Sequence, residues 1–185
     1  MKKVLLSFFF IIALGTAASA QRGETWTPIS SVASIAGKWA GSETMEIPRN
    51  ETTGIPNSIL TFSIFMEYVP NNKDVTIEMQ IDFYQFLDDW IKVPAMRDLK
   101  VTKDQVWNMV KELLKNILED DIVFNNNYRM SYFMNSEADS FSGSNNLQIN
   151  QDKTMIKLIF DETISFGLGD KGITEMILTK NWQSL

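Results

Sequence analysis

Alternating apolar and polar residues form the clearest pattern along the chain, and this pattern predicts a protein built mainly of β-strands. Residues 37–48 alternate from Trp39 onward, and residues 58–69 and 75–87 alternate over longer stretches than the ~5–6 residues of an average strand. Strands of this length are long enough to wrap the full height of a barrel. A strand that begins with a buried Trp also needs a closed β-structure to cover the indole. We therefore expect an all-β, mainly antiparallel fold.

Shorter strands and one helix complete the predicted fold. Residues 102–118 predict an α-helix that opens on a capping box of Thr102 and Gln105 and continues with apolar residues at helical spacing. A short helical turn at residues 30–35 precedes the first long strand. Strand character returns weakly around Phe141 and clearly in residues 122–124, 128–135, 146–150, 154–161, 164–168 and 173–182. We expect eight or nine strands with one inserted helix.

The first twenty residues have the features of a secretory signal peptide. Lys2 and Lys3 form a positive segment, residues 4–14 are apolar, and cleavage is expected after Ala20. The apolar run is shorter than the ~20 residues of a membrane-spanning helix, so a membrane anchor is the weaker interpretation. We expect an exported protein, periplasmic or secreted, and its short Lys-Lys signal and lack of Cys favour a bacterial source. The predicted organisation is a signal peptide at 1–20, a flexible lead at 21–28 and one domain at 29–185.

The charge balance excludes several partners. Removing the first 20 of 185 residues leaves 165, which suits one domain with a substantial core. Two of the 17 basic residues, Lys2 and Lys3, lie in the signal, so 15 remain against 23 acidic residues and the net charge is −8. No basic cluster remains, so neither nucleic acid nor an anionic lipid surface is an expected partner. No later apolar run is long enough to span a membrane as a helix.

The chain contains no His and no Cys, which removes His-based and Cys-based nucleophilic catalysis and the usual zinc sites. Carboxylate chemistry remains, because Asp88-Asp89 and Glu119-Asp120-Asp121 flank the helical insertion. These residues are interpreted either as a Ca²⁺ or acid/base site or as solvated loop ends. Neither group shows the Gly-punctuated Asp spacing of a hard-cation loop. We therefore expect no metal, no cofactor and no enzymatic activity.

A short helical turn, then Gly37-Lys38-Trp39 at the start of the first long strand, then a meander of long strands, resembles the lipocalin-like (calycin) superfamily. Residues 141–149 also look like a late hairpin strand of bacterial lipocalin-like domains. The resemblance implies an up-and-down β-barrel that holds a small apolar ligand. Gly37 and Trp39 would form a structural plug at the closed end of the barrel. The family places an Arg near the last strand, stacked on the Trp, where this chain offers Lys180.

The apolar strand faces are the best candidates for a ligand cavity. If they point inward, they form a Met- and aromatic-rich interior, and Met adapts to irregular ligands. The same large side chains are able to fill the barrel, which leaves a filled core as the alternative. Arg129 and Lys157 fall on the faces of their strands that point away from the predicted interior. A buried carboxylate would lack a cationic partner, so we expect a ligand that is neutral or keeps its charge at the barrel mouth. The expected lining residues are Met45, Phe62, Ile64, Met66, Met79, Ile81, Phe83, Met130 and Tyr132.

The favoured hypothesis is an exported lipocalin-like protein that binds a small apolar or neutral molecule in its barrel. The alternative is a filled barrel that acts as an interaction or envelope-associated module through exposed residues such as Phe65, Tyr84 and Phe86. An outer-membrane barrel is disfavoured, because residues 76–82 place polar side chains on the outer face. An enzyme would need carboxylates that converge in the cavity. The helix at 102–118 either packs on the barrel or acts as a movable lid.

Overall fold

The structure is a computed structural model that describes residues 24–52, 54–117, 122–165 and 169–180. The predicted signal peptide lies outside these residues. The strands in the described residues are β1 (Trp26–Pro28), β2 (Gly37–Ile47), β3 (Ser58–Tyr68), β4 (Asp74–Asp82), β5 (Ile122–Phe124), β6 (Arg129–Glu137), β7 (Leu147–Asn150), β8 (Met155–Ile164) and β9 (Ile173–Lys180). The helices there are α1 (Tyr84–Trp90), α2 (Pro94–Asp98), α3 (Lys103–Ile117) and the 3₁₀-helices η2 (Val32–Ile35) and η3 (Ala138–Phe141).

The nine strands form one antiparallel sheet in the order β1-β7-β8-β9-β2-β3-β4-β6-β5. The prediction of a mainly antiparallel β-fold with eight or nine strands is confirmed. The prediction of a closed barrel is wrong, because β1 and β5 are the outermost strands and do not pair with each other. Both have only three residues, and the chain passes from β6 to β7 through η3. The two strands that would have to pair to close a ring are thus the shortest ones in the described sheet.

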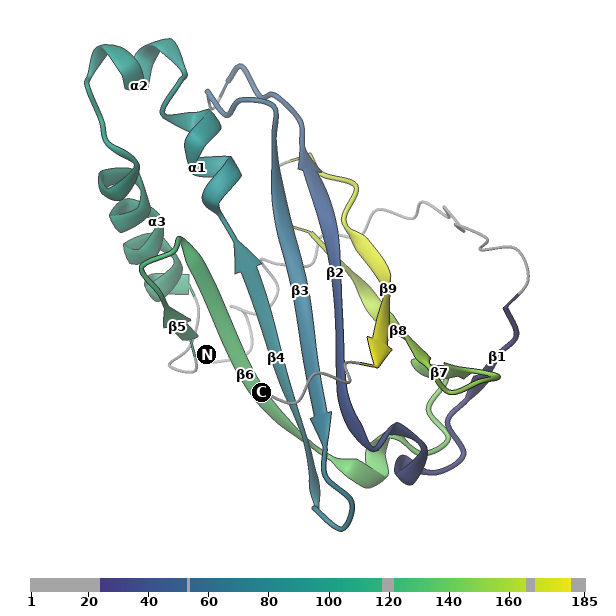
Figure 1. The fold of residues 1–185 in the computed structure, drawn as a ribbon. Helices are drawn as coiled ribbons and strands as arrows, with labels where there is room; N and C mark the ends of the chain where they lie inside the picture. The colour runs from purple at the N-terminus through teal and green to yellow at the C-terminus, as the bar shows by residue number, and fades with distance from the viewer. Residues whose placement is uncertain (1–23, 53, 118–121, 166–168, 181–185) are drawn as a thin grey trace, which may run out of the picture.

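The sheet bends, and its two halves share one hydrophobic core. Figure 1 shows β6, β4, β3 and β2 side by side as long strands, with β9, β8 and β7 turned away on the other side of β2. β2 and β3 pair along their whole length, from Gly37 opposite Tyr68 to Ile47 opposite Ser58. The helices α1, α2 and α3 lie together beside the β4 and β6 side of the sheet (Figure 1). We call the sheet face that carries the core the inner face.

Trp39 lies at the start of β2, next to η2. It is 1% exposed, and its Nε1 donates a hydrogen bond of 2.8 Å to the Ile35 carbonyl oxygen. Ser31 caps η2, so the short helical turn predicted before the first long strand is confirmed. Gly37 has a φ of 114°, which favours glycine, and a Cβ at this position would lie 3.3 Å from Lys180 Cε. The turn therefore packs against the indole and satisfies its N–H.

The strand predicted at residues 75–87 ends early, and α1 takes its last part. Asp82 Oδ1 accepts a hydrogen bond of 2.8 Å from the backbone N–H of Tyr84, the first residue of the helix. Phe86 and Leu87 are therefore buried side chains of a helix and not of a strand. The short α2, with Pro94 as its first residue, follows where the alternation had ceased.

The helix predicted at residues 102–118 is α3, and its capping box is present. The Thr102 backbone N–H donates to Gln105 Oε1 over 2.8 Å, and the Gln105 N–H donates to Thr102 Oγ1 over 3.2 Å. This helix buries the side chains of Val106, Trp107 and Leu114. α3 therefore packs on the rest of the protein through an apolar stripe, as its spacing predicted.

Residues 26–28 of the predicted lead form β1, in which Trp26 pairs with Asn150 of β7. One expectation about an irregular segment is wrong. The weak strand expected around Phe141 is the 3₁₀-helix η3, which backbone hydrogen bonds hold in place at both ends. The Ala138 N–H donates to the Lys73 carbonyl over 2.7 Å, and the Gly143 N–H donates to the Ile29 carbonyl over 2.8 Å. Hydrogen bonds to distant segments thus decide both structures, and local patterning does not show them.

No helix in the described residues combines the length and the apolar character needed to cross a membrane.

Candidate functional site

The structure places most of the predicted cavity residues in adjacent rows on the inner face. Phe62 of β3 is paired with Ile81 of β4, and Ile81 is paired with Met130 of β6. The neighbouring row consists of Ile64, Met79 and Tyr132 on the same three strands. Phe83 lies off the sheet as the N-cap residue of α1. Met79 and Tyr132 are partly exposed, whereas the buried members are Met45, Phe62, Ile64, Met66, Ile81, Phe83 and Met130.

Four side chains of β4 and β6 remain partly exposed on the inner face, and we call Ile77, Met79, Tyr132 and Met134 the inner-face strip. Ile77 is paired with Met134, and Met79 is paired with Tyr132. Met134 is 36% exposed, although its face carries the core elsewhere. The predicted lining residues did not include Ile77 and Met134, but the alternation of both strands continues through them. The strip is therefore an apolar surface next to the open side of the sheet.

An aromatic cluster adjoins one end of this strip. The Trp107 ring of α3 lies 5.5 Å from the Phe83 ring, 5.8 Å from the Phe124 ring and 6.1 Å from the Tyr128 ring, measured between centroids. Trp107 is 3% exposed, and its buried Nε1 has no hydrogen-bond partner among the residues that the structure describes. Sequence patterning predicted Trp107 as part of a packing stripe, and nothing in the sequence indicates that its N–H lacks an acceptor.

The cationic side chains of the neighbouring strands form ion pairs on the opposite, outer face. Arg129 Nε lies 2.7 Å from Asp82 Oδ2. Lys157 Nζ lies 3.8 Å from Glu175 Oε2 and 4.7 Å from the centroid of the Trp26 ring. Arg129 and Lys157 thus lie on the face that the alternation predicted for them.

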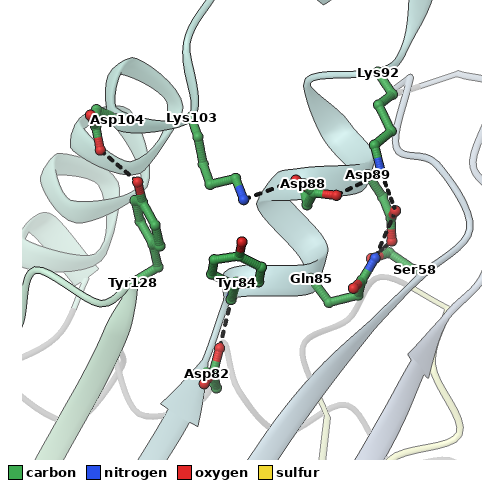
Figure 2. Close-up of polar contacts among 10 residues, drawn as sticks. All are labelled: Ser58, Asp82, Tyr84, Gln85, Asp88, Asp89, Lys92, Lys103, Asp104 and Tyr128. Carbon is green, nitrogen blue, oxygen red and sulfur yellow. Dashed lines mark hydrogen bonds and ion pairs between the residues drawn. The ribbon is translucent and has the colours of Figure 1, made fainter.

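The carboxylates at residues 88 and 89 are engaged in contacts between elements. Lys92 Nζ lies 2.6 Å from Asp88 Oδ2, and Lys103 Nζ lies 2.9 Å from Asp88 Oδ1. Figure 2 shows Lys103 reaching from the start of α3 to α1, where its Nζ also lies 3.7 Å from the centroid of the Tyr84 ring. Asp89 accepts a hydrogen bond of 2.8 Å from Ser58 Oγ of β3. These contacts tie α1 to both α3 and the sheet.

The electrostatics of this cluster do not favour acid/base catalysis by Asp88. Hydrogen bonds from Lys92 and then from Lys103 hold the pKa of Asp88 below its usual range. Burial opposes charging of Lys103, but the hydrogen bond to Asp88, the negative charge of Asp88 and the contacts with Tyr84 together outweigh it and raise the pKa of Lys103. A general acid or base works best with a pKa near the working pH, and Asp88 is shifted away from it. The cluster is therefore best described as a clamp between helices.

The proposed partner carboxylates at 119–121 lie outside the described residues. Among the residues that are described, no three or more His, Cys, Asp or Glu side chains are grouped so as to hold a metal ion.

A polar hollow of about 460 Å³ lies beside the turn between β7 and β8. Asn150, on its wall, is buried, and its Oδ1 accepts hydrogen bonds of 2.9 Å from the backbone N–H groups of Thr154 and Met155. Its Nδ2 donates to Thr154 Oγ1 over 3.2 Å and to Glu24 Oε2 over 3.4 Å. Because these groups bond to one another, the hollow is shaped by the turn and presents no unpaired buried group to a ligand.

Comparisons with protein-family models, with curated proteins and with solved structures find no significant match to this chain. The inner-face strip, with the aromatic cluster at its end, is the apolar surface of the described residues that suits a ligand best.

Proposed function

We propose that the protein is an exported, lipocalin-like binding protein that holds a small neutral apolar molecule on the inner face of its open sheet. The observation that supports this proposal is the inner-face strip, whose Ile77, Met79, Tyr132 and Met134 stay partly exposed next to the hydrophobic core. Ligand sites are mostly apolar with few polar groups, and Met side chains adapt to the shape of what they bind. The strip has this composition.

The surrounding charges support a neutral ligand. On β6 the cationic side chain is Arg129, which faces away from the strip and is paired with Asp82. A carboxylate placed on the strip would lose its hydration without gaining a cation from β4 or β6. A neutral molecule has no charge to desolvate and avoids this loss of hydration free energy.

The contacts of Trp39 support the lipocalin-like part of the proposal. In the resembling family an Arg near the last strand stacks on the Trp that follows Gly-x. Here Lys180 of β9 is paired with Trp39, and its Nζ lies 5.4 Å from the centroid of the indole ring. A lysine thus makes the cation–π contact for which the family uses arginine. The open sheet remains a difference from the family's closed barrel.

Export is proposed from the N-terminal sequence, with Lys2 and Lys3 before an apolar segment and a small-residue site ending at Ala20. After cleavage we expect a periplasmic or secreted protein. Mass spectrometry of the protein from its own host tests this, because a mass beginning at Gln21 is expected and an intact N-terminus would contradict it.

Dye binding with a pair of adjacent variants tests the proposed site. The mature protein is titrated with the neutral fluorescent dye phenylnaphthylamine, and its affinity is compared between Met134→Glu and Phe133→Glu. Both positions lie on β6 and are similarly exposed, at 36% and 44%, but they point to opposite faces. We expect Met134→Glu to weaken dye binding about tenfold or more, because it puts a charge on the apolar strip, while Phe133→Glu leaves it unchanged.

Equal dye affinity in both variants, or no binding to the wild-type protein, would contradict the proposal. Circular dichroism of both variants serves as the folding control.

A second candidate function is docking of a partner protein on the outer face. Phe65 of β3 and Phe133 of β6 are 41% and 44% exposed, and each is paired with Glu78, which lies between them. Tyr84 is also exposed, whereas Phe86 is buried and drops out of the predicted surface. Crosslinking in the host tests this candidate, because a captured partner should be lost with Phe65→Ser and retained with Met134→Glu.

A further inference from the structure

We infer that the ligand of the inner-face strip carries a neutral carbonyl or ester oxygen, which accepts a hydrogen bond from Nε1 of Trp107. This inference rests on the proposed function and adds the chemical class of the ligand's polar group.

The first observation is the unpaired donor itself. Nε1 of Trp107 is buried, and within the described part of the chain no group accepts its hydrogen bond. Buried polar groups in folded proteins are nearly always hydrogen-bonded, because an unmade bond leaves the full cost of desolvation. The indole N–H is only a donor, so the missing partner must be an acceptor. By contrast, Nε1 of the equally buried Trp39 is satisfied by the Ile35 carbonyl.

The second observation is where this donor lies. The Trp107 ring lies 5.8 Å from the Phe124 ring, and Phe124 is paired with Met130 on β6. Two residues further along β6, on the same face, Tyr132 is paired with Met79 of the inner-face strip. Two residues of a strand advance by about 7 Å, which is less than the length of a short acyl chain. A ligand lying on the strip has to extend by this distance along β6 to bring one end to the aromatic cluster that contains Trp107.

The third observation concerns the charge that the acceptor is able to carry. Lys111 Nζ lies over the Trp107 ring, 6.0 Å from its centroid. Phe83, Phe124 and Tyr128 surround the same ring with aromatic surface. An ionised carboxylate in such surroundings needs a cation in direct contact to offset its lost hydration, whereas a neutral carbonyl needs one donor. Nε1 of Trp107 is a single neutral donor, and one such donor suits an ester, ketone or amide better than the carboxylate of a fatty acid.

The experiment compares competitors that differ only in the acceptor. Phenylnaphthylamine is displaced from the mature protein by methyl decanoate, which has an ester, by undecane, which has none, and by decanoate, which is charged. The variant Trp107→Phe keeps an aromatic ring and removes the N–H. We expect this variant to weaken the binding of methyl decanoate about three- to tenfold, the range of one neutral hydrogen bond, and to leave the affinity for undecane unchanged. Phe133→Glu, on the outer face, is the matched control and should change neither competitor.

A second measurement does not depend on how the variant folds. In the ¹⁵N-labelled wild-type protein, the indole N–H resonance of Trp107 should move downfield with methyl decanoate and stay in place with undecane.

Each other outcome overturns the inference in a distinct way. If Trp107→Phe weakens the binding of methyl decanoate and undecane equally, Trp107 serves only in packing. If it weakens the binding of neither, the N–H is bonded to an internal water and not to the ligand. Tighter binding of decanoate than of its methyl ester would mean that the site prefers an anion. In these cases the strip still binds apolar molecules and the proposed function survives. If the wild-type protein binds neither the dye nor any competitor, the proposed function fails as well.

Discussion

Nζ of Lys180 lies 5.4 Å from the centre of the Trp39 indole, and the two residues are paired where the last strand meets the first long strand. Within the described residues, β9 is paired with β2 at Trp39–Lys180 and Ala40–Thr179. The contact between cation and ring therefore lies where β9 joins β2, between the two halves of the sheet.

Replacing Lys180 with Met should lower the free energy of unfolding by about 0.5–1 kcal/mol, because the apolar stem is kept and the cation–π contact is lost. Lys180→Arg should retain or increase stability, since a guanidinium also stacks on the ring. Urea unfolding measures both, with Lys171→Met at an exposed position as the control. A Lys180→Met protein as stable as wild type would show that the contact contributes nothing.

Gly41→Ala tests the same join from the side of the backbone. A Cβ at Gly41 would overlap the Ile177 carbonyl oxygen and press on the Leu178 side chain. We expect a loss of about 1–3 kcal/mol, the usual range for overpacking, and faster hydrogen exchange in β9. Thr44→Ala, at an exposed position of β2, should change stability by less than about 0.5 kcal/mol. Equal stability of the two variants would mean that β9 shifts without cost.

Thr102→Ala should destabilise α3 through its capping box. The Thr102 side chain accepts the Gln105 N–H, and without it that donor loses its partner. Caps of this kind contribute about 0.5–2 kcal/mol, so thermal unfolding should shift to lower temperature. Thr102→Ser keeps the accepting oxygen and should recover most of the loss. If Ser and Ala behave alike, the effect comes from the methyl group of threonine and not from the cap.

The Asp88 clamp should make stability depend on pH in the acid range. Hydrogen bonds from Lys92 and Lys103 lower the pKa of Asp88 in the folded protein. Its contribution is therefore complete above the unfolded pKa of about 3.9 and is lost as the pH falls through the lower folded value. Asp88→Asn should be less stable than wild type at neutral pH, and the difference should shrink on acidification.

Urea midpoints between neutral pH and strongly acidic pH measure this difference for Asp88→Asn. Asp98→Asn, which removes an exposed carboxylate from α2, is the control for charge alone. A difference that stays constant down to the lowest pH would exclude the clamp as its cause.

Local alternation was sufficient to predict the faces of β2, β3, β4 and β6, because a period of two residues determines which side chains share a face. It failed at α1, because apolar residues at 83 and 87 suit a strand face and a helix face equally well. In the structure the N–H of Tyr84, the first residue of α1, donates to Asp82, a contact that periodicity does not show. Closure of the sheet was beyond local patterning, since it depends on whether distant strands pair. The unpaired N–H of Trp107 was likewise invisible until its neighbours were placed.

The short outermost strands have a consequence for self-assembly. A sheet that stays open keeps backbone N–H and C=O groups along both edges, where further chains are able to add and build a fibre. Here each edge strand is three residues long, and β1 ends with Pro28, which has no N–H to donate. Such edges offer little template to a second chain. The shortness of β1 and β5 therefore limits how many backbone groups these two strands present to a second chain.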